Sequence, residues 1–222
     1  MVLVLLPGWD STQGTLRRFE RDGSGWREVG AAAPIVVGRN GAAWGLGLNA
    51  PIHDSGPIKR EGDGRSPAGV FAIGEAFGYA AGDATALPYT AMTASDWCVD
   101  VSGSPYYNRI VDAASVGADA VAGASEHMRL DLFNHGDQRY RLGFVIEHNR
   151  QQHPGGGSCI FAHLWSGPTS TTSGCTAMAD PTMQRLLAWL DPAQQPVFVL
   201  LPDTQYARLR TAWQLPRVEL NP

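Results

Sequence analysis

Glycine and proline interrupt this sequence at short intervals and limit the length of any regular element. The chain contains 26 glycines and 15 prolines among its 222 residues. Glycine weakens helices and strands, and proline removes a backbone donor, so both residues concentrate in turns. The apolar residues between these turns form short runs, which favour strands over long helices. The sequence therefore predicts a mostly β fold.

Strands are predicted over most of the chain. They cover residues 2–6, 15–21, 26–29, 34–38, 42–48, 69–73, 97–101, 140–147, 158–163 and 196–201. The turn D-G-S-G at residues 22–25 predicts a hairpin between the second and third of these strands. The Asn40-Gly41 turn predicts a second hairpin, between residues 34–38 and 42–48.

Two segments near the C-terminal end have a helical pattern. In the first, Asp180 is the expected N-cap and Pro181 suits the first helical position. In the second, Asp203 is the expected cap. Apolar residues then fall on one face of each helix, namely Met183, Leu186, Leu187 and Leu190 in the first and Tyr206, Leu209 and Trp213 in the second. The expected architecture is a single domain over residues 1–222, mostly β, with a few helices near its C-terminal end.

Charge and hydropathy exclude two classes of partner. The formal net charge is −4, and the 17 lysines and arginines are scattered, with no run longer than two. Without a basic run, nucleic acid is not expected as a partner. No stretch approaches the roughly 18 apolar residues of a membrane span, so the chain is not expected to be transmembrane. The N-terminal M-V-L-V-L-L-P-G-W-D fits a first strand better than a signal peptide.

The three cysteines lie in different surroundings. Cys98 and Cys159 lie in apolar, strand-like stretches, where they can form a disulfide in an exported protein or remain buried thiols. Cys175 instead follows the small residues T-S-T-T-S-G, which are poor core material. Such a turn is suited to holding a thiol at the edge of a cleft.

Cys175 and His163 are the candidate catalytic pair. A cysteine nucleophile requires a base, a group that orients the base, and amide donors for the oxyanion. His163 ends a predicted strand and Cys175 follows after a loop, so both side chains can reach one cleft. Gly174 permits close approach of the backbone to a substrate, and amides around residues 173–175 are candidate oxyanion donors. A helix that followed the turn directly would favour the thiolate through its dipole.

Two other interpretations of Cys175 and His163 compete with catalysis. The cysteine can be a small buried apolar residue and the histidine a hydrogen-bonded polar one, or both can belong to a structural zinc site. One stretch is rich in possible zinc ligands, but their spacing matches no known finger or ribbon; they are His148, His153, Cys159, His163 and Cys175.

Residues 59–71, K-R-E-G-D-G-R-S-P-A-G-V-F, resemble a surface loop followed by a strand. They lack the G-K-[ST] ending of a phosphate loop, and within them Asp63 and Arg65 can pair.

Taken together, four motifs in this order resemble the L,D-transpeptidase catalytic domain (YkuD type) of bacterial cell-wall enzymes. They are G-D-G-R-S-P-A-G-V-F, H-N, I-F-A-H-L-W and T-S-G-C, and the resemblance extends from about residue 35 to residue 178. It implies a β-rich, β-sandwich-like catalytic fold. It also implies Cys175 as nucleophile and His163 as base, with the carbonyl of Leu164 orienting the imidazole.

The sequence departs from the family pattern near the nucleophile. Ser173 stands where the family commonly has histidine, and Thr176-Ala177 replace the usual Ile or Val and Arg. The loop between histidine and cysteine is also shorter than usual. Expected substrate-binding residues are Ser173, His148, Asn149, Arg65, Trp165 and Asn108, with Tyr107 as a further cleft residue and Lys59 as an alternative carboxylate ligand. His148 is also a rival candidate for the base.

The resemblance implies acyl transfer on peptidoglycan stem peptides. Cys175 would attack the meso-diaminopimelate carbonyl of a tetrapeptide stem, release terminal D-Ala and pass the acyl group to an amine. Water as acceptor would give L,D-carboxypeptidase activity, and a non-catalytic peptidoglycan-binding module is the alternative outside enzymes. No metal or organic cofactor is required, carbapenems are expected to acylate the cysteine, and the protein is expected to be exported to the periplasm or cell envelope.

Overall fold

The main sheet closes on itself as a ring of strands. The computed structural model describes residues 1–23, 25–50 and 56–219, and in it 33% of residues are strand and 15% helix. The expectation of a mostly β fold with few helices is confirmed. In order of pairing, the ring contains β1 (Val2–Leu6), β14 (Val197–Pro202), β6 (Ser66–Gly78), β11 (Leu142–Ile146), β12 (Phe161–Leu164), β13 (Thr176–Met178), β4 (Ala33–Val36) and β2 (Gln13–Asp22), which pairs again with β1.

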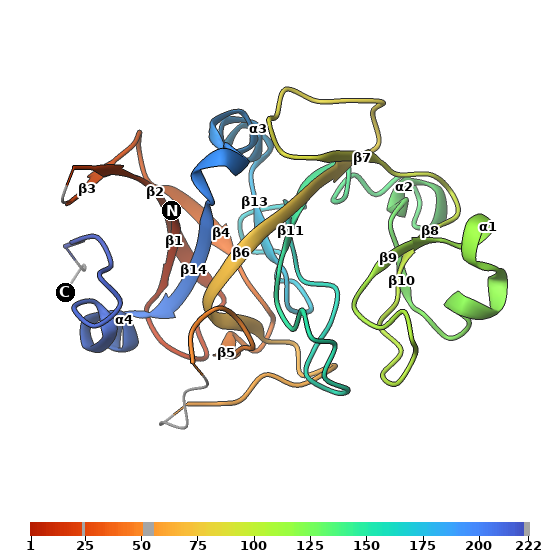
Figure 1. Cartoon of the computed structure of the whole chain (residues 1–222), viewed down its shortest axis with the longest axis horizontal. Coiled ribbons are helices and arrows are strands. Elements are labelled where there is room, and N and C mark those ends of the chain that lie inside the picture. The colour runs from red at the N-terminus through yellow and green to blue at the C-terminus, as the bar shows by residue number, and fades with distance from the viewer. Residues whose placement is uncertain (24, 51–55, 220–222) are drawn as a thin grey trace.

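Short strands extend this ring, and a second sheet lies beside it. β3 (Gly25–Glu28) pairs with β2, while β5 (Ala42–Trp44) and β7 (Tyr89–Ala91) pair with β6. The small sheet has the order β10 (Glu126–His127), β8 (Asp96–Cys98) and β9 (Ile110–Asp112). Figure 1 shows it at the end of the molecule opposite to β3 and α4.

The helices are short and lie outside the ring. They are α1 (Ala113–Val116), α2 (Leu130–Phe133), α3 (Asp180–Trp189) and α4 (Asp203–Leu209), with 3-10 turns η1 (Ala118–Val121) and η2 (Pro192–Gln194). α3 packs against β11 and β12, and α4 packs against β1 and β14. The sequence predicted α3 and α4 but not α1 and α2, which are single turns that follow β9 and β10 of the small sheet.

Apolar side chains form two clusters that meet at β6 and β12. The larger one is centred on the ring, where every residue of β1 is buried. The smaller one joins Phe77 and Phe161 of the ring to Cys98 and Met128 of the small-sheet region, and it includes Cys175. The nucleophile candidate therefore lies where the small sheet packs against the ring.

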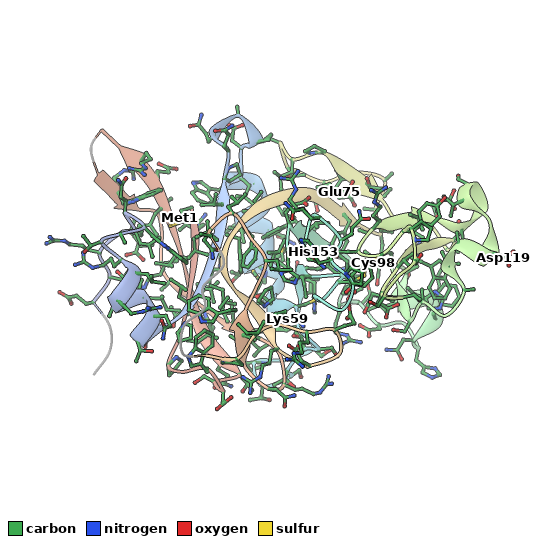
Figure 2. The ribbon with its side chains drawn as sticks, turned by 60° about the horizontal axis from the view of Figure 1, so that its bottom comes forward. Met1, Lys59, Glu75, Cys98, Asp119 and His153 are labelled. Atoms are coloured by element: carbon green, nitrogen blue, oxygen red, sulfur yellow. A yellow bond between two sulfur atoms is a disulfide. The ribbon has the colours of Figure 1, made fainter. Side chains whose placement is uncertain are left out.

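A disulfide links the two sheets. Cys98 of β8 is bonded to Cys159, which precedes β12, across 61 positions of sequence. Figure 2 shows Cys98 between Met1, near one end of the molecule, and Asp119, near the other. The sequence left this pairing open, and the structure shows that it forms. Cys175 is the remaining, free cysteine.

The first predicted hairpin forms, but the second does not. β2 and β3 pair from Phe19 with Glu28 to Asp22 with Gly25; residue 24 of the predicted turn lies outside the described residues. At the Asn40-Gly41 turn the Gly41 amide does donate to the Gly38 carbonyl at 2.8 Å. However, β4 pairs with β2 and β13, and β5 pairs with β6. β4 and β5 therefore pair with other strands of the main sheet and not with each other.

Neither aspartate predicted to cap a C-terminal helix does so. Ala179 and Pro202 occupy the N-cap positions, and Asp180 and Asp203 are already the first helical residues. Asp180 instead forms an ion pair with Arg141 at 2.5 Å. The carboxylates still lie at the positive end of each helix, where a negative charge is favourable.

The disulfide should contribute measurably to stability. Replacing Cys98 and Cys159 by alanine should lower the free energy of unfolding by about 4 kcal/mol, because the bond closes a long loop in the unfolded chain. Urea unfolding followed by circular dichroism measures this change. Reductant should destabilise the wild type and leave the double variant unchanged; a wild type insensitive to reductant would contradict the linkage.

Candidate active site

Hydrogen bonds to one carbonyl fix the turn that carries Cys175. The Cys175 oxygen accepts a bond from Ser66 Oγ at 2.9 Å and one from Thr172 Oγ1 at 2.6 Å. Ser66 Oγ in turn accepts the Gly38 amide at 3.0 Å. Three segments that are distant in sequence thus meet below the nucleophile. The residue after this turn enters β13, so no helix begins at Cys175, and the predicted dipole effect does not apply.

Glycine is required at position 174 by both conformation and space. Its φ is +154°, and a Cβ atom there would lie 3.1 Å from the Arg65 carbonyl oxygen. A side chain would therefore push the nucleophile turn away from the loop beneath it. Close approach of the backbone at this point explains the Gly-Cys pair in the sequence.

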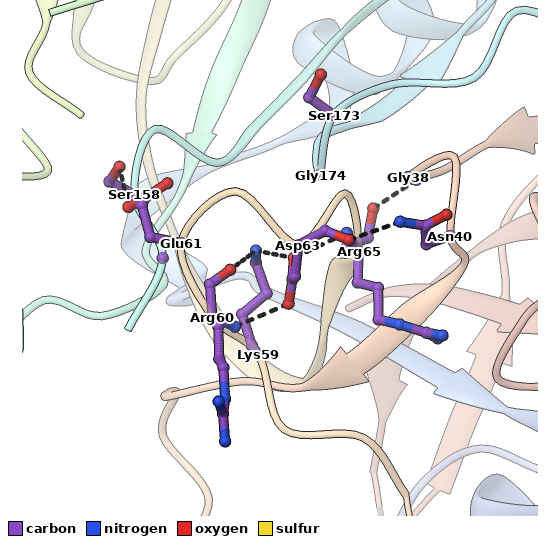
Figure 3. Close-up of polar contacts among 12 residues, drawn as sticks. Gly38, Asn40, Lys59, Arg60, Glu61, Asp63, Arg65, Ser158, Ser173 and Gly174 are labelled. Atoms are coloured by element: carbon purple, nitrogen blue, oxygen red, sulfur yellow. Dashed lines mark hydrogen bonds and ion pairs between the residues drawn. The ribbon is translucent and has the colours of Figure 1, made fainter. Parts of the chain in front are cut away.

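Asp63 organises the glycine-rich loop below the turn (Figure 3). One carboxylate oxygen accepts Lys59 Nζ at 2.5 Å and the Arg65 amide at 2.9 Å, and the other accepts the Arg60 amide at 2.8 Å. The loop leads directly into β6 at Ser66. The motif thus supports the nucleophile turn from below.

His163 and Cys175 share one face of two neighbouring parallel strands. His163 pairs with Ala177, and Ala162 pairs with Thr176, which places Phe161 beside Cys175. Because side chains two residues apart on a strand point the same way, His163 and Cys175 lie on the same face. Both side chains are buried and line the same cavity.

The imidazole is held in one orientation by its own strand. His163 Nδ1 lies 2.7 Å from the Leu164 carbonyl oxygen. Since a carbonyl can only accept, Nδ1 carries the proton and Nε2 keeps its lone pair. No hydrogen bond joins Nε2 to the thiol. Cys175 Sγ instead accepts the Phe161 amide at 3.3 Å and donates to the Cys159 carbonyl at 3.5 Å.

Burial keeps both groups neutral in the free protein. Burial raises the pKa of the Cys175 thiol to about 12, and the charge of Glu126 acts in the same direction. Hydrogen bonds from the Phe161 amide and the Tyr140 hydroxyl oppose this rise in pKa. Burial also lowers the pKa of His163 to about 4. At neutral pH the site therefore contains a thiol and a neutral imidazole able to accept a proton.

The cavity has a volume of about 430 Å³ and contains both charge signs. Its lining residues with chemically active side chains are Arg39, Lys59, Glu61, Asp100, Ser125, Glu126, Arg139, Tyr140, Ser158, His163, Thr172, Ser173 and Cys175. Lys59 pairs with Asp63, and Arg139 pairs with Asp137 at 2.6 Å. Within the described part of the chain Arg39 has no ion pair, and its Nη1 donates to Ser173 Oγ at 3.1 Å.

The predicted binding residues His148, Asn149 and Asn108 do not line this cavity. His148 uses both ring nitrogens in the chain, since Nδ1 accepts the Leu46 amide at 3.2 Å and Nε2 bonds the Gly156 carbonyl at 2.9 Å. Because neither nitrogen is free, His148 is not a second base. Asn149 bonds to the backbone of residues 153 and 157, and Asn108 bonds to that of residues 148, 149 and 159. These side chains hold the loop that leads to Cys159.

Arg65, Trp165 and Tyr107 also lie outside the cavity. Arg65 does not pair with Asp63 through its side chain; it binds Asp10 at 2.7 Å and the Ala42 carbonyl at 3.0 Å. Figure 3 shows it directed away from Ser173 and Gly174. Trp165 lines a neighbouring hollow, and the Tyr107 hydroxyl bonds to Glu61 and the Gly157 amide. The structure brings together Cys175, His163, Gly174 and Ser173, with the Leu164 carbonyl behind the imidazole.

Sequence reasoning missed Arg39, Glu126 and Tyr140. Arg39 lies in the turn before β5. It is held beside the turn that carries Cys175 because its amide donates to the Thr172 carbonyl at 2.8 Å. Glu126 belongs to β10 of the small sheet, and Tyr140 precedes β11. None of the three belongs to a motif, so only the three-dimensional arrangement reveals them.

Two further findings concern metals and membranes. Among residues 1–23, 25–50 and 56–219, no three His, Cys, Asp or Glu side chains come together as metal ligands would. Cys159, one of the residues considered for zinc, is bonded to Cys98 instead. In the same ranges, no helix has the length and apolar character needed to cross a membrane.

The fold and the cavity define a class of β-rich proteins that present a cysteine and a histidine from adjacent strands. The sequence profile of the L,D-transpeptidase catalytic domain (YkuD) matches residues 10–199. The chain therefore belongs to this family, whose activity is directed at peptidoglycan. No curated protein and no solved structure matched the chain at the significance required.

The two buried histidines should make the free energy of unfolding depend on pH. Burial lowers the pKa of both His163 and His148 from 6.5 to about 4. The folded state holds them neutral while the unfolded chain binds protons below pH 6.5, so stability is full above pH 6.5 and falls toward pH 4. Each histidine should contribute about 3 kcal/mol to this loss.

Urea unfolding at pH 7.5 and pH 4.5 measures this dependence. His163→Gln should remove about half of the difference between the two pH values, because one of the two protonation sites is lost. His135→Gln, at an exposed position, is the matched control and should leave the difference unchanged. An unaltered pH dependence in His163→Gln would show that the imidazole is not held neutral.

Proposed function

We propose that this protein catalyses cysteine-dependent acyl transfer on peptidoglycan stem peptides, as an L,D-transpeptidase. The observation that carries the proposal is the shared face of β12 and β13, which presents His163 and Cys175 to one cavity. The Leu164 carbonyl fixes the imidazole tautomer that leaves Nε2 free to act as base. Family membership supplies the class of substrate.

The reaction proceeds through a thioester. Substrate entry displaces the Cys175 proton from the Cys159 carbonyl toward His163 Nε2, and the sulfur attacks the carbonyl of the meso-diaminopimelate residue of a tetrapeptide stem. The amide of Cys175 donates to the resulting oxyanion. His163 then protonates the nitrogen of the departing D-Ala as the C–N bond breaks. An acceptor amine attacks the thioester, gives its proton to His163, and regenerates the thiol.

Because the resting thiol and imidazole are both neutral, proton transfer accompanies attack. The high pKa of the thiol and the low pKa of His163 disfavour a standing thiolate–imidazolium pair. The base therefore becomes effective when substrate occupies the cavity and excludes water. Such a nucleophile is protected from adventitious alkylation and oxidation in the free enzyme.

Arg39 is the group we assign to the carboxylate of the donor stem. Lys59 and Arg139 in the cavity are neutralised by aspartates, and Arg65 is bound elsewhere. Arg39 lies at the rim beside Ser173 and retains its charge for a ligand. The family pattern commonly has an arginine shortly after the cysteine, and this sequence lacks it.

The disulfide supports export of the protein. Disulfides form and persist in oxidising compartments and are rare in the cytosol, and this protein contains the Cys98–Cys159 disulfide. Peptidoglycan is assembled outside the cytoplasm, so the substrate and the redox requirement agree. The periplasm or cell envelope is the location that we infer from the two together.

Intact mass after incubation with a carbapenem tests the nucleophile. Opening of the β-lactam ring by sulfur breaks its C–N bond and adds the whole inhibitor mass. One adduct is expected in the wild type, none in Cys175→Ala, and a rate lower by about 100-fold or more in His163→Ala. His135→Ala is the matched histidine control. An adduct that persists in Cys175→Ala would place the nucleophile at another residue, and no adduct in the wild type would favour the peptidoglycan-binding module.

Paired donor peptides test the role of Arg39. Arg39→Ala should raise the KM for a tetrapeptide with a free C-terminal carboxylate by about 10- to 100-fold, because one charge-assisted hydrogen bond is lost. The KM for the C-terminal amide should not change. Arg60→Ala, a nearby arginine outside the cavity, is the matched control. Equal effects on acid and amide would remove Arg39 from the carboxylate site.

A further inference from the structure

A glutamate from the small sheet and a tyrosine that precedes β11 approach the candidate nucleophile. Tyr140 is buried, and its hydroxyl donates to Glu126 Oε1 at 2.6 Å. Both side chains line the cavity with Cys175 and His163. Neither residue belongs to the motifs that identify the family, and the mechanism above does not use them.

Packing fixes the tyrosine ring beside the catalytic pair. Its ring centroid lies 5.1 Å from that of His163 and 5.6 Å from that of Phe161, in both cases edge to face. The Phe161 amide is the donor to Cys175 Sγ. The Tyr140 hydroxyl is bonded to Glu126 in the cavity that contains the thiol, and hydrogen bonding by Tyr140 lowers the pKa of that thiol.

The disulfide determines where Glu126 lies. Glu126 pairs with Cys98 in the small sheet, and Cys98 is bonded to Cys159, whose carbonyl accepts the Cys175 thiol. The carboxyl has no cation bonded to it within the described part of the chain, and the Tyr140 hydroxyl is its hydrogen-bond partner there. A carboxyl in this position is expected to hold a proton more readily than an exposed one.

We propose that Glu126 and Tyr140 form a positioning pair that controls the charge of the Cys175 sulfur. When Glu126 carries a proton, it donates to the Tyr140 oxygen, and the Tyr140 hydrogen turns to the sulfur and stabilises the thiolate. When Glu126 is ionised, it draws the Tyr140 hydrogen to itself, and its negative charge opposes the thiolate. The two arrangements differ by one proton, which Glu126 exchanges with solvent, while the Tyr140 hydrogen stays on its oxygen and changes only its direction.

The charges around the pair agree with this exchange. Burial and the Asp100 carboxylate raise the pKa of Glu126, while Tyr140 and Arg139 lower it. The charge of Glu126 raises the pKa of the thiol, whereas Tyr140 and the Lys59 ammonium lower it. These charged groups come from different parts of the fold. Asp100 follows β8, Arg139 precedes β11 and Lys59 lies in the loop before β6. His163 of β12 completes this set as the base.

The pair predicts opposite effects for two near-isosteric changes. Glu126→Gln removes the negative charge and keeps a donor for the Tyr140 oxygen, so the Tyr140 hydrogen is directed to the sulfur. Tyr140→Phe removes the hydroxyl and leaves the ring in place. The thiol pKa should fall by about one to two units in the first variant and rise by about one to two in the second.

Alkylation by iodoacetamide measures the thiol without any peptidoglycan substrate. The thiolate displaces iodide, and Cys175 is the single free cysteine, so intact mass counts one event. At pH 8, on the rising part of the rate profile, Glu126→Gln should react about 10- to 100-fold faster than wild type and Tyr140→Phe about 10- to 100-fold slower. The control is Tyr79→Phe. The Tyr79 hydroxyl is partly buried and donates to the Asp137 carbonyl, so this variant should react at the wild-type rate.

The inference rests on the proposed function only in treating Cys175 as the nucleophile. A protein that alkylates as predicted but forms no carbapenem adduct would retain the pair and lose the transpeptidase assignment. Changes of the same sign in both variants would indicate loosened packing and overturn the inference. If Tyr140→Phe does not fold, Glu126→Gln alone decides, since a rate equal to or below that of wild type contradicts the pair.

Discussion

The parallel pairing of β12 with β13 is the constraint on which the site depends. It places Phe161 beside Cys175 and His163 beside Ala177, so one strand supplies both the amide that bonds the sulfur and the imidazole that faces it. In the proposed mechanism the strand geometry sets the separation of nucleophile and base without a third catalytic side chain. The Leu164 carbonyl, part of the same strand, performs the orienting task that a carboxylate performs in other triads.

Two supports hold this strand pair in register. Below the nucleophile, Ser66 and the Asp63-centred loop fix the Cys175 carbonyl through hydrogen bonds between segments that are distant in sequence. Above it, the disulfide ties the small sheet to the start of β12, bringing an acidic wall to the cavity. Burial by both supports raises the thiol pKa and lowers that of His163. The same packing that positions the two groups therefore also keeps both of them neutral in the free protein.

Local patterns predicted what depends on local chemistry. The strands and the two C-terminal helices follow from hydrophobic patterning and turn residues. For Gly174 the sequence predicts close approach of the backbone to a substrate, and the structure shows close approach to the Arg65 carbonyl. Strand partners could not be read in this way: the turn at Gly41 forms as predicted, yet β4 and β5 pair elsewhere in the sheet. For the same reason His148, Asn149 and Asn108, adjacent to a motif in sequence, hold a loop, whereas Arg39 and Tyr140, in no motif, line the cavity.

The central claim is that Cys175 carries the stem peptide as a thioester, and trapping this intermediate tests it most directly. The protein would be mixed with a tetrapeptide donor, quenched in acid within the first turnover, and analysed by intact mass and peptide mapping. The account predicts an adduct of the donor minus D-Ala on the peptide that contains Cys175, formed at the same rate as D-Ala is released. Release of D-Ala without such an adduct, or an adduct on another residue, would contradict it.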